Sequence, residues 1–113
     1  MAAFVNLPVA DLTAAVAFYT GAGFALDPRM TDDTAACVVI GEGLCAMLLT
    51  RAKWAQFSAR PVPDTRRTCA VMLAFDLPDR AAVDALMGRV LAAGGTEPRA
   101  AQDHGFMYAR AFE

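Results

Sequence analysis

Long hydrophobic runs are absent from this chain. Its longest apolar stretches hold only a handful of residues, far fewer than the roughly 20 that a membrane-spanning helix needs. The N-terminus also lacks the pattern of a secretory signal, because Asn6, Pro8 and Asp11 interrupt its apolar residues. We therefore expect no membrane segment and a cytoplasmic location.

The chain also lacks a concentration of positive charge. It has 10 basic and 12 acidic residues, a formal net charge of −2, and both signs are interspersed. A protein that tracks a phosphate backbone needs a basic stripe, so nucleic acid is not an expected partner. Gly-rich phosphate loops and the G-x-S-x-G motif are missing as well, and nucleotide chemistry has no support.

Cysteine and histidine are scarce. The three cysteines, Cys37, Cys45 and Cys69, show no C-x-x-C spacing, and each lies in an apolar, strand-like run. We expect reduced thiols that act as small core hydrophobes. With His104 as the only histidine, few arrangements for metal binding or nucleophilic catalysis are available.

What the chain has is an apolar fraction of 57% spread over 113 residues, which is enough to bury one core. Residues 4–10 predict a strand, Asp11 predicts a helix cap, and Gly21 and Gly23 predict the helix end. The expected helix stripe is Leu12, Ala15, Val16 and Tyr19, and the expected strands that follow are 24–30, 34–40 and 44–50.

The same order then restarts after a proline-containing connector at 59–68. Residues 69–77 predict a strand and Asp79 a cap, followed by a helix that ends at Gly94 and Gly95. Its expected stripe is Val83, Leu86, Met87, Val90 and Leu91, and the expected strands after it are 96–103 and 106–112. The pattern indicates an α+β fold with module one at 1–58 and module two at 69–113, the latter about one strand short.

A resemblance to a known family rests on three segments: FVNLPVADLTAAVAFYTGAGF (4–24), MLAFDLPDRAAVDAL (72–86) and QDHGFMYARAFE (102–113). They resemble the vicinal oxygen chelate superfamily, which includes glyoxalase I, bleomycin resistance proteins and extradiol dioxygenases. The most specific part is the D-L-x-x-A-x-x-F-Y-x-x-x-G-F run at 11–24. The resemblance implies paired βαβββ modules that curve a mixed sheet around a cleft, commonly in a homodimer.

Metal-using members of that superfamily bind a divalent ion through side chains on the first and last strands of each module. The resemblance carries these positions onto Phe4, Met72 and a residue near Met47, and the fourth would follow Glu113. Hard and borderline cations need carboxylate oxygen or imidazole nitrogen, which these side chains lack. We therefore expect no metal at this place and no cofactor.

Two residues late in the chain are weak catalytic candidates. His104 follows Asp103, and a carboxylate beside an imidazole can begin a general-base pair; Tyr108 could donate to an oxyanion. Adjacent strand residues point to opposite faces, however, so Asp103 would orient His104 only across a turn. A plain turn with a surface imidazole explains the same residues.

The leading hypothesis is a metal-free, glyoxalase-like or bleomycin-resistance-like homodimer that binds a small, partly apolar molecule. Phe4, Asn6, Met47 and Met72 would line its cleft, with His104 and Tyr108 as further contacts. Whether the chain is an enzyme stays open: a lyase, isomerase or dioxygenase with an atypical centre is one alternative. A ligand-free, ferredoxin-like assembly module is the other, and it would have only two strands between the first helix and the connector.

Overall fold

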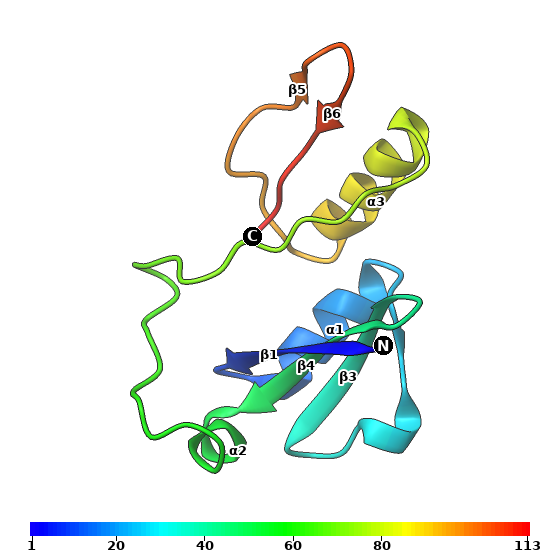
Figure 1. Ribbon diagram of the computed structural model, residues 1–113. Coiled ribbons are helices and arrows are strands. Elements are labelled where there is room, and N and C mark those ends of the chain that lie inside the picture. The colour runs from blue at the N-terminus through cyan, green and yellow to red at the C-terminus, as the bar shows by residue number, and fades with distance from the viewer.

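A computed structural model describes residues 1–113 and shows two units of unequal regularity (Figure 1). The first unit contains β1 (Ala3–Val9), α1 (Leu12–Gly21), β2 (Ala25–Leu26), the 3-10 helix η1 (Pro28–Met30), β3 (Ala35–Gly41), β4 (Leu44–Thr50) and α2 (Arg51–Ala55). The second contains α3 (Arg80–Ala92), β5 (Gln102–Asp103) and β6 (Tyr108–Ala109). None of the helices is long and apolar enough to cross a membrane.

The first unit is built on a mixed sheet with the strand order β1-β4-β3-β2. β3 and β4 form an antiparallel hairpin whose turn contains Gly43 at φ 72°, a conformation that glycine adopts without strain. β1 pairs in parallel with β4, so β4 lies between β1 and β3 in the sheet. This sheet confirms the predicted α+β class with a curved mixed sheet.

The helix α1 begins where the sequence predicts, because the side chain of Asp11 accepts a hydrogen bond of 3.0 Å from the amide of Ala14. Its apolar side packs on one face of the sheet, where Ala36, Val38, Ala46 and Leu48 are almost fully buried. The helix residues in this core are Leu12, Ala15, Val16 and Tyr19, the predicted stripe. Removing these apolar surfaces from water is the main source of stability in this unit.

The helix α3 packs against α1 through a second, smaller core (Figure 1). Asp79 caps its start by accepting a hydrogen bond of 2.8 Å from the amide of Ala82. Leu86, Met87 and Val90 are buried as predicted, but Leu91 is 45% exposed, so its assignment to the core was wrong. Leu91 follows Val90 by about 100° around the helix, which turns it away from α1.

Residues 69–77 do not form the predicted strand. The prediction rested on an apolar pattern, yet a strand also needs a neighbour that supplies hydrogen bonds. In the first unit, β1 pairs only with β4, and no strand occupies the equivalent place beside 69–77. The segment therefore exposes Val71, Met72 and Leu73, with Met72 at 89%.

The last predicted strands, 96–103 and 106–112, are realised as a long hairpin with only short regular pairing. β5 and β6 are antiparallel, and at the open end Thr96 and Glu113 exchange backbone hydrogen bonds of 2.8 and 2.9 Å. In the first unit three strands, β2, β3 and β4, follow α1 before the connector. The ferredoxin-like alternative required two, so it was wrong.

Candidate functional site

The face of the sheet that α1 leaves free gathers three of the predicted site residues. Side chains alternate between the faces of a strand, so residues that are even-numbered in β1 and odd-numbered in β3 and β4 point away from α1. In register, Asn6 lies opposite Met47, and Met47 lies opposite Cys37. The next row contains Phe4, Cys45 and Val39. We call this surface, with Phe4, Asn6, Cys37, Cys45 and Met47, the free face.

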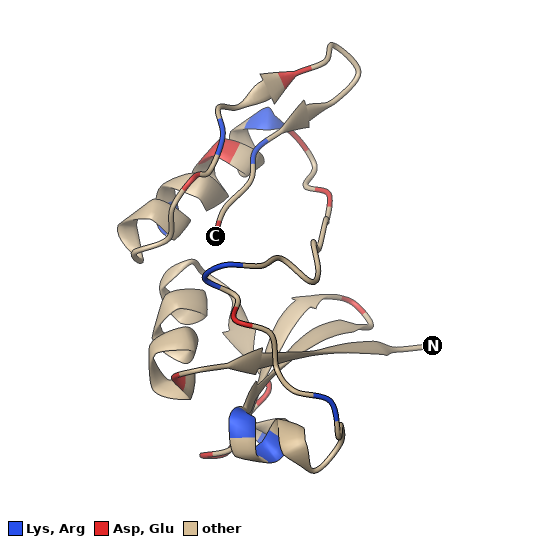
Figure 2. Cartoon of the chain, turned by 90° about the vertical axis from the view of Figure 1, so that its left-hand side faces the viewer, with Lys and Arg blue, Asp and Glu red and all other residues tan.

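The free face is apolar and partly open. None of the four strands of this sheet contains a charged residue, and the Lys, Arg, Asp and Glu residues of the first unit lie on helices, turns and connections (Figure 2). Phe4 is 45% exposed and Asn6 is exposed, while Cys45 and Met47 are half-buried. At the end of this face where α2 contacts β1 and β4, Leu49 and Ala35 are buried. An apolar surface with one exposed amide can take up an apolar molecule that carries a polar group.

The cysteines differ in their surroundings. Cys37 is fully buried, and burial together with contact with Cys45 raises the pKa of its thiol to about 11. Cys69 is exposed, so its assignment as a core thiol was wrong. The reason is the same as for its segment, since 69–77 pairs with no strand.

Met72 and His104 lie outside any enclosed site. Met72 is on the unpaired segment and faces solvent. His104 is exposed in the β5–β6 turn, where its amide donates to the carbonyl of Met107 at 2.8 Å. The carboxylate of Asp103 binds Arg80 and the amide of Gly105. Asp103 therefore does not orient the imidazole of His104 as a general base would require.

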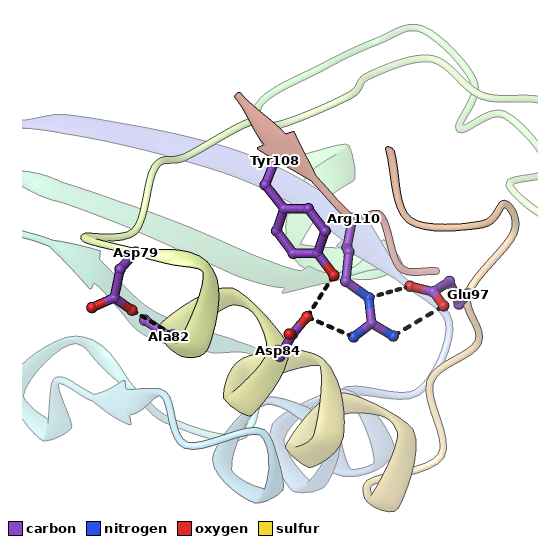
Figure 3. Close-up of polar contacts among 6 residues, drawn as sticks. All are labelled: Asp79, Ala82, Asp84, Glu97, Tyr108 and Arg110. Atoms are coloured by element: carbon purple, nitrogen blue, oxygen red, sulfur yellow. Dashed lines mark hydrogen bonds and ion pairs between the residues drawn. The ribbon is translucent and has the colours of Figure 1, made fainter. Parts of the chain in front are cut away.

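Tyr108 belongs to a polar cluster between α3 and the hairpin (Figure 3). Its hydroxyl donates to Asp84 at 2.7 Å, and the guanidinium of Arg80 lies 4.1 Å from the centre of its ring. The hydrogen bond to Asp84 raises the pKa of Tyr108. The hydroxyl of Tyr108 is therefore bonded to Asp84, and Arg80 lies over its ring, both on the α3 side of the hairpin.

Arg110 is the centre of the same cluster. It donates to Glu97 at 2.7 and 3.1 Å and to Asp84 at 3.0 Å (Figure 3). The bidentate hydrogen bond lowers the pKa of Glu97, and the bonds from Tyr108 and Arg110 lower that of Asp84. These contacts join α3 to the hairpin where no strand pairing does so.

The residues at the expected metal positions do not fit a divalent ion. Phe4 and Met72 have no oxygen or nitrogen in their side chains, and Met47 offers only a thioether. Nowhere in residues 1–113 do three His, Cys, Asp or Glu side chains come together as potential ligands. These side chains therefore do not fit the divalent ion that the metal-using members bind.

A cavity of about 270 Å³ lies between the two units. Apolar side chains from both units line it, and Glu42, Asp76 and Arg89 are the charged residues at its wall. Arg89 is held there because its Nε donates to the carbonyl of Ala22 at 2.8 Å. The cavity shares none of the predicted site residues.

Sequence reasoning missed two neighbours of the predicted site. Asp27 follows β2, and its amide donates to the carbonyl of Cys37 at 2.9 Å, which brings it into the row of Cys37 and Met47. Cys37 was predicted only as a core residue. Strand alternation places Ala25 and Asp27 on one face and Leu26 on the other. Only the strand register shows which of these faces is the free face.

Comparisons with known proteins agree with this fold. The family model for the bleomycin resistance protein-like N-terminal region matches residues 2–41. A hypothetical protein from S. aureus has a similar structure, with a TM-score of 0.81 and 23% identity over 100% of this chain and 85% of that one. A glyoxalase/bleomycin resistance protein/dioxygenase family enzyme from Burkholderia phytofirmans PsJN has a TM-score of 0.71 and 19% identity, over 96% and 86%. No curated protein matches the chain.

The matched region contains β1, α1, β2 and all of β3, including the D-L-x-x-A-x-x-F-Y-x-x-x-G-F run. The two solved structures extend the likeness of fold over the second unit. The N-terminal region of this chain is thus similar to the bleomycin resistance protein-like family model, and the whole chain shares the fold of a glyoxalase/bleomycin resistance protein/dioxygenase family enzyme.

Proposed function

We propose that the chain binds a small, partly apolar molecule on the free face without the help of a divalent metal. The observation that carries this proposal is the register of β1, β4 and β3, in which Phe4, Asn6 and Met47 share one uncharged face. Apolar side chains supply binding energy through the area that they remove from water, about 25 cal/mol per Å². The amide of Asn6 can orient a polar group of the ligand by hydrogen bonding.

Met72 is included in the proposal as a side chain that contacts the ligand or a partner subunit. Its segment exposes Val71, Met72 and Leu73, an apolar surface that water solvates poorly. A homodimer would cover such a surface, and members of this superfamily commonly form one. We further propose that the protein acts in the cytoplasm, in keeping with its free thiols.

The proposal is tested by screening a library of aromatic fragments against the full chain with ligand-observed NMR, with EDTA present throughout. We expect fragment hits whose affinity falls in Phe4→Ala. Leu91→Ala is the matched control, because Leu91 has the same 45% exposure but lies on α3. Equal losses in both variants, or hits only in a parallel screen with a divalent ion in place of EDTA, would refute the proposal.

A further inference from the structure

Three sulfur-containing side chains lie together on the free face. Cys37 on β3 is directly opposite Met47 on β4, and Cys45 is two residues before Met47 on the same strand. Directly opposed residues have Cβ atoms about 4.5–5.5 Å apart, and diagonal neighbours are about 7–8 Å apart or somewhat less. The two thiols and the thioether can therefore turn toward one point.

The surroundings of these side chains favour a soft cation over a hard one. Cys37 is fully buried, whereas Cys45 and Met47 are half-buried and leave a route from the free face. Between them they offer sulfur and no carboxylate or imidazole.

Charge beside the three sulfur atoms comes from one ion pair. Asp27 lies next to Cys37 in the row, its side chain is only 14% exposed, and it binds Arg29 at 2.8 Å. The guanidinium of Arg29 is itself 85% exposed and thus well solvated. Because solvent screens an exposed charge more than a buried one, the carboxylate of Asp27 keeps more of its effect than the guanidinium of Arg29.

We infer that Cys37, Cys45 and Met47 form a binding site for one Cu(I) ion. Thiolate and thioether sulfur are the ligands that soft Cu(I) prefers, while the hard ions of the superfamily need oxygen or nitrogen. On binding, two S–H bonds break, two protons leave to solvent and three S–Cu bonds form, with no change of oxidation state. The inference goes beyond the proposed function and shares only Met47 with the proposed ligand contacts.

The inference is tested by anaerobic titration of the reduced full chain with Cu(I), using bathocuproine disulfonate as the competing chelator. We expect one ion per chain and a sulfur-only first coordination shell by X-ray absorption. The affinity should fall at least about tenfold in Cys45→Ala and in Met47→Leu, because each removes one of three bonds to the ion. Cys37→Ala should do the same, with its fold checked by circular dichroism.

The chain supplies its own control. Cys69 is exposed and lies in no strand of the sheet, so Cys69→Ala should leave the affinity unchanged. Loss of binding in Cys69→Ala but not in Cys45→Ala would overturn the inference. So would an oxygen or nitrogen coordination shell, or failure to bind in competition with the chelator. Since Cys45→Ala leaves Phe4 and Asn6 intact, fragment binding in that variant separates a failure of this site from a failure of the proposed function.

Discussion

Asn6 and Met47 lie opposite each other on the parallel strands β1 and β4, on the face of the sheet that α1 does not cover. One residue further along each strand, Leu7 and Leu48 are also opposite each other, but they belong to the core under α1. Neighbouring positions on these strands therefore have different roles. A substitution on the free face should affect binding, and the same substitution one residue away should affect folding.

The first prediction uses this alternation. Met47→Asp places a charge on the half-buried free face, so we expect loss of fragment affinity with the fold retained. Leu48→Asp buries the same charge at a position that is 1% exposed, so we expect an unfolded chain. Circular dichroism and NMR fragment titration of both variants provide the measurements. Unfolding by Met47→Asp would show that the free face is core.

The second prediction concerns the packing of α3 on α1. A Cβ at Gly95 would lie 2.6 Å from Cγ1 of Val90 and 3.2 Å from the ring of Phe18. Gly95→Ala should therefore lower the free energy of unfolding by about 1–3 kcal/mol, the usual cost of overpacking. Urea denaturation measures this change.

Gly88, in the middle of α3, is the matched control for Gly95. A Cβ there meets nothing within 4 Å, so Gly88→Ala should raise stability by about 0.5–1 kcal/mol through better helix propensity. The two variants carry the same chemical change with opposite expected signs. Equal effects would mean that Gly95 is not packed against Val90 and Phe18 as described.

The third prediction is a pH dependence from the cluster around Arg110. The hydrogen bond from Arg110 holds the pKa of Glu97 below its ordinary value. A carboxylate with a lowered folded pKa stabilises the fold above its unfolded pKa, about 4.3 for Glu, and this contribution is lost as the pH falls through the folded pKa. Wild type should thus lose Tm on acidification below about pH 5, and Arg110→Gln should start lower and lose less.

Arg99→Gln serves as the control for Arg110→Gln, because Arg99 is exposed and takes no part in the cluster. Its Tm should follow the wild type across the whole acid range. Parallel acid profiles for the wild type and Arg110→Gln would contradict the assignment of Arg110 as the group that lowers the pKa of Glu97.

The fourth prediction addresses an enzymatic centre at His104. The imidazole is exposed, and Asp103 is engaged by Arg80 and Gly105, so no group prepares His104 as a base. His104→Ala should therefore leave fragment affinity and the turnover of any identified substrate unchanged. A large fall in turnover with intact binding would instead support the enzyme alternative.

The sequence predicts the local features of this fold well. Both helix starts follow from Asp11 and Asp79, whose side chains cap the first turn through contacts three residues away. The strands 34–40 and 44–50 are also close to β3 and β4, because a short turn pairs them directly. Such features depend on residues that are neighbours in the chain.

Long-range relationships were not predictable in the same way. The apolar pattern of 69–77 indicates a strand as strongly as that of β3, yet its pairing depends on a neighbour that the pattern cannot specify. The row of Asp27, Cys37, Met47 and Asn6 depends on the register of four strands, and a shift of one residue would reverse every face. The sequence therefore named Asn6 and Met47 as site candidates but missed Asp27 and Cys37.

The central claim, a binding face that works without the superfamily's divalent ion, is tested most directly by one dialysis experiment. The full chain is equilibrated with Mn²⁺, Fe²⁺ or Ni²⁺, its metal content is determined, and the affinity for the best fragment is measured before and after EDTA. We predict no stoichiometric ion and an unchanged affinity, because Phe4, Met47 and Met72 supply no hard donor. One ion per chain, with fragment binding abolished by EDTA, would contradict the account.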